Sequence, residues 1–214
     1  MKIRYLGHSC FLLADGAGTR IVTDPFGDVG FSMPHVEAEG ASISHAHFDH
    51  ANVGAVKCGA LFDRAGNYAL GGIKVSAVES FHDDAQGKKR GKNLIFLFQT
   101  EGLTLCHLGD LGERCSPALL QKIGRVDVLL IPVGGNYTIG AAEAKEYIDA
   151  LRPALVIPMH YKTEGLDIDV APLDGFLKLV KGTEVEHAGC EIMINREKID
   201  KKHTKIIVME RDRG

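Results

Sequence analysis

The residues with the clearest chemical potential lie in one short stretch, residues 44–52, which reads SHAHFDHAN. Here His45, His47, Asp49 and His50 follow one another as H-x-H-x-D-H. Side chains two positions apart on an extended segment point to the same side, so His45 and His47 can bind one ion together. Imidazole nitrogens suit zinc, iron and copper, and a carboxylate adds an oxygen ligand. The alternative, a polar turn in which Asp49 caps a short helix, leaves the histidines unexplained. The stretch therefore predicts a metal site.

Composition narrows the class of protein. The chain has 214 residues, 45% hydrophobic and 25% charged, which is typical of one soluble globular domain covering residues 1–214. A net charge of −3 disfavours a dedicated nucleic-acid binder, because such proteins are usually basic. The five cysteines form no C-x-x-C pair, which indicates reduced thiols. We find neither a signal peptide pattern nor an apolar run of membrane-spanning length, so we expect a cytoplasmic protein.

The elements that must position these residues can be predicted from apolar patterns and turn signals. In the first half the patterns predict mainly strands, at residues 2–14 with an interruption at 7–9, and at 19–23, 41–44, 73–78, 93–100 and 103–108. A loop is predicted over 26–39 and a short helix over 51–56. The second half alternates, with helices after Ser116-Pro117, over 141–151 and over 173–180, strands at 126–133 and 154–158, and short strands within 184–209. This order predicts a layered α/β architecture.

Further ligand-type residues follow directly after predicted strands, where functional residues of sheet proteins collect. These residues are His82, Asp110 and His160. His107 lies on the same strand as Asp110 but three positions earlier, so its side chain should point to the opposite face, and we interpret it as a core or surface histidine. The remaining histidines, His35, His187 and His203, have no partner motif.

With these residues in place, the chain resembles the metallo-β-lactamase-fold hydrolase superfamily. The resemblance rests on H-x-H-x-D-H, a later single histidine, the Asp of Gly109-Asp110 and a histidine after a late strand. Within that superfamily the chain is most similar to small bacterial zinc-dependent hydrolases related to ascorbate-6-phosphate lactonase. The landmarks are Leu6-Gly7-His8-Ser9, Thr23-Asp24-Pro25, Gly134-Gly135-Asn136-Tyr137-Thr138 and Pro158-Met159-His160-Tyr161.

The resemblance implies a four-layer αββα sandwich with a metal site along one edge. It also implies two divalent metal ions, zinc first and manganese or iron as alternatives. His45, His47 and His82 would hold the first metal, Asp49, His50 and His160 the second, and Asp110 would bridge both. Two such metals, about 3.5–4 Å apart, lower the pKa of a water molecule and orient it for attack on a carbonyl or phosphoryl centre.

The chemistry also needs groups that move protons and hold the substrate. Asp49 is the best candidate for a general base. The resemblance implies that His8 lies near the metals, where it could donate a proton or bind substrate, and a plain turn histidine is the alternative. Asp24 either orients a metal-binding histidine or simply forms a turn. The candidates for substrate binding are Asn136, Tyr137 and Lys162.

The basic segment Lys88-Lys89-Arg90-Gly91-Lys92 follows His82 closely and has two interpretations. It could close as a lid over an anionic substrate. We favour the alternative, a solvated turn, because runs of charged residues are usually exposed.

The favoured function is hydrolysis of a small, anionic ester, lactone or phosphoester. Three alternatives stay open: a phosphodiesterase or nuclease of the same fold, an iron-binding redox protein, and a non-catalytic metal-binding module. The nuclease lacks a basic arm for RNA, and diiron redox relatives typically carry Glu where this chain has His47. We expect a small-molecule substrate, neither nucleic acid nor membrane as partner, and leave open whether the chain forms a homo-oligomer.

Overall fold

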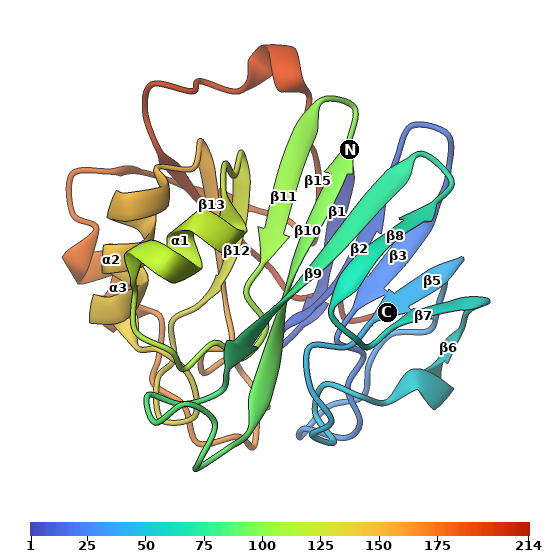
Figure 1. The fold of residues 1–214 in the computed structure, drawn as a ribbon, viewed down its shortest axis with the longest axis horizontal. Coiled ribbons are helices and arrows are strands. Elements are labelled where there is room, and N and C mark those ends of the chain that lie inside the picture. The colour runs from blue at the N-terminus through green and yellow to red at the C-terminus, as the bar shows by residue number, and fades with distance from the viewer.

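Two β-sheets packed face to face form the centre of the molecule (Figure 1), which a computed structural model describes over all residues from 1 to 214. The smaller sheet has the strand order β15 (Glu191–Met193), β1 (Lys2–Gly7), β2 (Cys10–Ala14), β3 (Arg20–Thr23), β5 (Gly40–Ser42) and β7 (Ala60–Phe62). The larger sheet has the order β14 (Glu184–Ala188), β16 (Lys205–Met209), β13 (Leu155–Met159), β12 (Val128–Pro132), β11 (Leu103–His107), β10 (Lys92–Thr100), β9 (Ile73–Phe81) and β8 (Gly66–Leu70). The two packed sheets of the predicted sandwich are confirmed, but α-helices cover only one of its two outer faces, so the fourth layer of the expected αββα arrangement is not helical.

The main hydrophobic core lies between the two sheets. Tyr5 and Phe11 from the smaller sheet and Phe96 and Phe98 from the larger one are among its fully buried aromatic side chains. Strand β9 shows how the sequence produces this arrangement, because its buried side chains, such as Ile73 and Val75, alternate with more exposed ones.

Three helices cover the outer face of the larger sheet: α1 (Pro117–Ile123), α2 (Ala141–Leu151) and α3 (Asp174–Leu179). They bury Tyr147 and Phe176 in a second core. Helix α1 begins as its sequence predicts, since Ser116 accepts a hydrogen bond from the backbone N–H of Leu119 at 3.3 Å and Pro117 needs no partner for its nitrogen. None of the helices is long and apolar enough to cross a membrane.

The outer face of the smaller sheet carries no α-helix. A third core, with Val22, Phe26, Val36 and Val56, is covered there by the 26–39 loop and by a two-stranded sheet of β4 (Val36–Glu37) and β6 (Val56–Lys57). The predicted helix over residues 51–56 was too long, because only Val53–Ala55 form a single 3₁₀ turn before β6 begins. A second 3₁₀ turn, η2, spans Arg196–Lys198.

Strand directions bring many carboxyl ends to one edge of the sandwich. Strands β1, β3 and β5 run the same way in the smaller sheet, and β9, β11 and β13 do so in the larger sheet. Backbone hydrogen bonds join the two sheets at this edge, from His160 N to His8 O at 3.1 Å and from Leu94 N, near the start of β10, to Ser44 O at 2.8 Å. The residues that follow these strands therefore meet at one place.

The contribution of the inter-sheet core can be measured with Phe96→Ala. Removing this fully buried ring, which stacks on Phe98 at 6.0 Å, should lower the free energy of unfolding by about 3–5 kcal/mol, because a cavity remains. Urea denaturation measures the loss. Leu179→Ala, at a half-exposed position, is the control and should change the free energy by roughly 0.5 kcal/mol or less. Equal losses in the two variants would contradict this account of the core.

Candidate metal centre

The stretch 44–52 leaves β5 and folds back on itself at the edge of the sandwich. His45 lies inside the fold, whereas His47 is exposed, and the N–H of His50 closes the turn on the carbonyl of His47 at 3.0 Å. His82, directly after β9, approaches the same place, with its ring 4.5 Å from that of His45. The nearest ring nitrogens of His45, His47 and His82 lie within 4.8 Å of one another. This first group is the set expected for one metal.

A second group lies beside the first. It consists of Asp49, His50 and His160, as expected, together with His8, and its ligand atoms are also within 4.8 Å of one another. His8 Nε2 is 3.1 Å from Asp49 Oδ2, and the His8 ring lies 4.3 Å from that of His160. His8 lies in the turn between β1 and β2, and this turn places its ring within the cluster.

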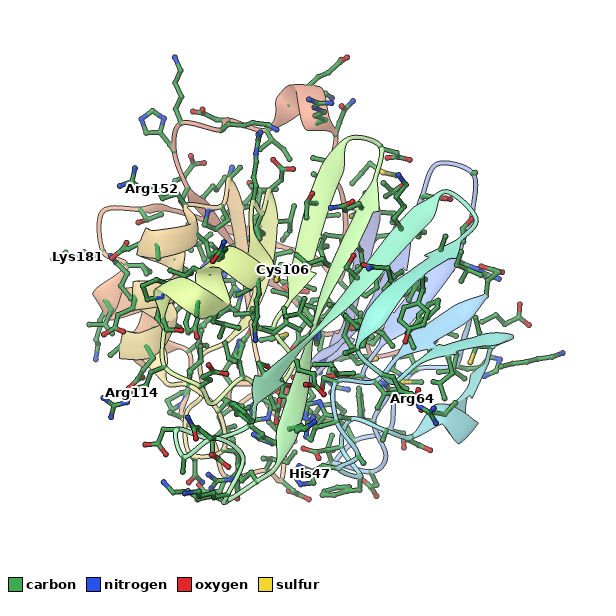
Figure 2. The ribbon with its side chains drawn as sticks, in the orientation of Figure 1. His47, Arg64, Cys106, Arg114, Arg152 and Lys181 are labelled. Carbon is green, nitrogen blue, oxygen red and sulfur yellow. The ribbon has the colours of Figure 1, made fainter.

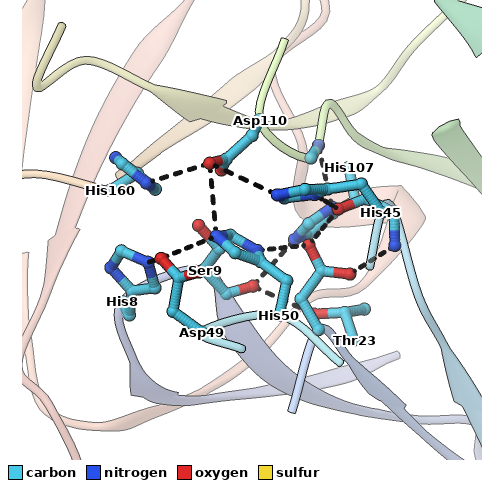
Figure 3. A network of polar contacts seen from close by, with 12 residues as sticks. His8, Ser9, Thr23, His45, Asp49, His50, His107, Asp110 and His160 are labelled. Atoms are coloured by element: carbon cyan, nitrogen blue, oxygen red, sulfur yellow. Dashed lines mark hydrogen bonds and ion pairs between the residues drawn. The ribbon is translucent and has the colours of Figure 1, made fainter. Parts of the chain in front are cut away.

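Asp110 lies between the two groups (Figure 3), and its Oδ2 atom is close to histidines of both. It is 3.4 Å and 3.9 Å from Nε2 of His82 and His45, and 3.2 Å from Nε2 of both His50 and His160. Two ligand atoms that are each about 2 Å from one ion can be at most about 4 Å apart. Asp110 is therefore placed where a carboxylate can be shared by both groups.

The cluster contains buried polar atoms that no protein group satisfies. His45 Nε2, His50 Nε2 and Asp110 Oδ1 have no hydrogen-bond partner, although all three are inaccessible to solvent. Such atoms are costly to bury unless they bind something else. Because the unsatisfied atoms are imidazole nitrogens and carboxylate oxygens that face one another, the residues fit divalent metal ions.

Burial lowers the pKa values of three histidines in the cluster, so that they can act as neutral ligands. Burial, with His160 nearby, lowers the pKa of His8 to about 4. Burial and the neighbouring His50 lower the pKa of His45 to about 3, and burial also lowers the pKa of His82. At neutral pH these rings carry no charge, so each has a nitrogen lone pair available for a metal.

The centre of the cluster instead favours positive charge. Burial alone would lower the pKa of His50, but the carboxylates of Asp110, Asp24 and Asp49 raise it well above its usual value. Burial would raise the pKa of Asp110, and the surrounding histidines hold it well below its usual value. The carboxylates thus remain ionised and enclose a position that a cation would occupy favourably.

Asp24 forms hydrogen bonds with two residues of the 44–52 stretch, His50 and Ser44. Its Oδ2 accepts hydrogen bonds from His50 Nδ1 at 3.0 Å and from the Ser44 hydroxyl at 2.6 Å, and its Oδ1 accepts one from the Ser44 N–H at 2.7 Å. A donated Nδ1–H leaves Nε2 of His50 free to face the metal position. Of the two interpretations of Asp24, the contacts match the one in which it orients a histidine.

The backbone around the cluster is strained. His8, Asp24 and His160 have positive φ angles of 54°, 40° and 51°, a left-handed conformation that is uncommon for residues other than glycine, although asparagine, aspartate and histidine adopt it more often than most. Such residues gather at functional sites, where the surrounding structure enforces them. Here the hydrogen bond between His160 N and His8 O ties two of them together.

Asn93 is a supporting residue that sequence reasoning missed. Its Oδ1 accepts a hydrogen bond from the Asp110 N–H at 2.9 Å, and its Nδ2 donates to the Leu108 carbonyl at 2.9 Å. Gly109, with φ of 57°, lies so close to Asn93 and Ser44 that a Cβ atom would collide with both. The only sequence signal was a polar residue at the start of an apolar strand.

Outside the cluster, His107 is buried, as the core interpretation expected. Its Nε2 donates to the Ser9 carbonyl at 2.8 Å, and its Nδ1 accepts from the Gly109 N–H at 3.0 Å. Both ring nitrogens are therefore occupied, and His107 has no free nitrogen for a metal.

The three candidates for substrate binding differ in their contacts. Asn136 Nδ2 donates to the Asp169 carbonyl at 2.7 Å, and Lys162 Nζ donates to the carbonyls of Leu166 and Ile168. The polar groups of Asn136 and Lys162 thus support the neighbouring 163–169 loop. Tyr137 is partly exposed, and its hydroxyl makes no hydrogen bond to the protein.

A wide cavity lies away from the cluster. It has a volume of about 1000 Å³ and lies between α2, β14 and the 195–204 segment, at the end where β13 begins. In Figure 2, Arg152 of this cavity and His47 of the cluster appear at opposite ends of the molecule. None of the cluster residues lines it.

The role of Asp24 can be tested through metal affinity. Asp24→Asn should weaken metal binding about 10- to 100-fold, because an amide cannot match the carboxylate that orients His50. Asparagine tolerates the positive φ, so the variant should fold, which circular dichroism verifies. Competition with a chromogenic chelator measures the affinity. Asp63→Asn, at an exposed position, is the control, and an Asp24→Asn variant that binds metal as tightly as this control would contradict the assignment.

Comparisons with known proteins agree with this geometry. The β-lactamase superfamily domain matches residues 2–160. A UPF0173 metal-dependent hydrolase of Desulforamulus reducens is 30% identical over 195 residues, which cover 76% of this chain and 85% of that protein. A UPF0173 metal-dependent hydrolase of Thermococcus kodakarensis is 29% identical over 193 residues, with the same coverage.

A solved structure extends the similarity over the whole chain. It is the crystal structure of a candidate Zn-dependent hydrolase of the metallo-β-lactamase superfamily from Thermotoga maritima, and it is 41% identical to this chain. The match covers 98% of this chain and 99% of the other, with a TM-score of 0.80. The chain belongs to the β-lactamase superfamily and, within it, to the UPF0173 metal-dependent hydrolases.

Proposed function

We propose that this hydrolase uses two divalent metal ions, zinc in the first place, to cleave an ester, lactone or phosphoester bond in a small anionic substrate. The observation that carries the proposal is the position of Asp110 Oδ2 within 4 Å of histidines from both ligand groups. His45, His47 and His82 would hold one metal, Asp49, His50 and His160 the other, and Asp110 would contact both. Five imidazoles and two carboxylates form a ligand set that suits zinc, while manganese or iron remain alternatives.

Bound metals would supply an activated water as nucleophile and would stabilise the negative charge that develops on the substrate. In this proposal Asp49 would take the proton of that water. Burial would raise the pKa of this carboxyl group, but His50 and His8 lower it, so the group is ionised and can accept a proton at neutral pH.

His8 is the partner of Asp49 in this scheme. Its Nε2–H points at Asp49 Oδ2 from 3.1 Å, so the ring keeps the carboxylate in one orientation. We assign to His8 the role of holding Asp49, which would take the proton from the water and pass it to the leaving group.

The surroundings of the cluster support a small substrate with an apolar part. Phe48, between His47 and Asp49, is two-thirds exposed, which is unusual for a phenylalanine. Tyr137 is a second partly exposed aromatic residue close to His82, since both line one cleft. Aromatic side chains near a reaction site commonly contact the substrate, so Phe48 and Tyr137 are proposed as its walls.

Removal of metal tests the proposed chemistry as a whole. Treatment with EDTA followed by dialysis should abolish hydrolysis of a panel of p-nitrophenyl esters, thioesters, lactones and phosphodiesters, and added Zn²⁺ should restore it. Elemental analysis of the purified protein should give about two metal ions per chain. A metal-loaded protein that cleaves no member of the panel would favour a non-catalytic metal-binding role, and iron as the purified metal would favour redox chemistry.

The role of Asp49 is tested by Asp49→Asn. Loss of the proton acceptor should lower kcat about 10²- to 10⁴-fold, because general base catalysis typically contributes that much. Metal content is measured in the same samples, so that loss of metal and loss of the base can be separated. Asp28→Asn, an exposed position on the 26–39 loop, serves as the matched control. If the Asp49→Asn protein kept its metal and its rate, Asp49 would not be the base.

A further inference from the structure

A polar cleft of about 260 Å³ opens beside the first ligand group. Three segments line it: the loop from His82 to Arg90, residues 112–114 and residues 136–143. All three follow strands of the larger sheet at the edge where the cluster lies, and His82 belongs to both the cleft and the cluster. The volume is slightly below the ~300–1000 Å³ of pockets for drug-sized ligands, so the cleft suits one compact chemical group.

Three acidic and three basic side chains line the cleft, and only one ion pair forms among them. Of the three acidic residues, Asp84 binds the ammonium group of Lys89 at 2.7 Å, and Glu143 accepts a hydrogen bond from the Gly140 N–H at 3.1 Å. The carboxylate oxygens of Asp83 accept hydrogen bonds from backbone N–H groups. The guanidinium groups of Arg90 and Arg114, by contrast, have no carboxylate within 4 Å. Two cations therefore face the cleft without a partner.

Asp83 holds the loop that carries Arg90. Its two carboxylate oxygens accept four backbone hydrogen bonds, from the N–H groups of Ala85, Gly87, Lys89 and Arg90, at 2.7–2.8 Å. Burial would raise the pKa of Asp83, but these four donors lower it to about 2, so the carboxylate stays ionised. The segment 83–90 is thus a loop folded around one carboxylate, in place of a freely solvated turn.

Arg90 is partly buried and lies over the ring of Tyr137, with its guanidinium carbon 5.4 Å from the ring centre. An aromatic face holds a guanidinium group by a cation–π contact and leaves its N–H groups free to bind. Guanidinium N–H groups bind carboxylate and phosphate oxygens in pairs. Lys88, two residues earlier, is exposed and does not line the cleft.

We propose that this cleft binds an anionic group of the substrate, a carboxylate or a phosphate, through Arg90 and Arg114, while the bond to be cleaved lies at the metal ligands. The proposal rests on the proposed hydrolase function and specifies its substrate: a small molecule with a second, uncleaved anionic group. It also revises the interpretation of the 88–92 segment, since Arg90 takes part in binding whereas Lys88 is solvated.

Calorimetry on the metal-loaded protein tests the site without turnover. The probes are succinate, which carries carboxylates, and glycerol 2-phosphate. The probe that binds with the higher affinity shows whether the cleft prefers a carboxylate or a phosphate. Arg90→Gln should weaken binding of the preferred probe about tenfold or more, because charge-assisted hydrogen bonds are lost. Lys88→Gln is the matched control and should bind like the wild type. If the wild type binds neither probe, or if Arg90→Gln binds as tightly as Lys88→Gln, the proposal is wrong.

Kinetics provide an independent measurement. For p-nitrophenyl hemisuccinate and the neutral p-nitrophenyl butyrate, the ratio of kcat/KM values reports preference for the distal carboxylate. Arg90→Gln should lower this ratio about tenfold, whereas an unchanged ratio would count against the proposal. If the wild type binds succinate in an Arg90-dependent way but cleaves no ester of any panel, the anion site stands and the proposed hydrolytic function fails.

Discussion

The carboxylate of Asp110 imposes the strongest physical constraint on this fold. It is almost fully buried, remains ionised and has imidazoles from both sheets within 4 Å. A buried charge is tolerated only where opposite charge or strong hydrogen bonds surround it. The two sheet edges must therefore meet closely, and the backbone bonds between His160 and His8 and between Leu94 and Ser44 hold them there. The rest of the sandwich supports this meeting point.

The sequence predicted the parts of the site that depend on local order. H-x-H-x-D-H is a local pattern, and His82, Asp110 and His160 follow directly after strands, so their convergence could be expected from sheet topology alone. Their division between two metals came from the family resemblance and stays a proposal. The support from Asn93 could not be foreseen, because it depends on which buried backbone group lies opposite that side chain.

The same limit applies to the residues around the site. A sequence shows that a lysine or an amide is near a ligand, but not whether its polar atoms are already used, and both Asn136 and Lys162 are occupied by the neighbouring loop. Arg90 shows the opposite outcome, because a run of basic residues usually indicates side chains that are exposed to solvent and bind nothing. Only the folded loop around Asp83 shows which of these side chains faces the cleft.

The positive φ angles of His8, Asp24 and His160 bear on how this sequence can change over time. Each costs roughly 1–3 kcal/mol, and natural domains have only about 5–15 kcal/mol of net stability. Selection for folding alone would replace these residues with glycine, which adopts the conformation freely. A chain that no longer needed these side chains could thus gain free energy of unfolding by carrying glycine at these positions, two of which now hold histidine. At these three positions the side chain that the site needs is therefore kept at the expense of the backbone conformation that would be most stable.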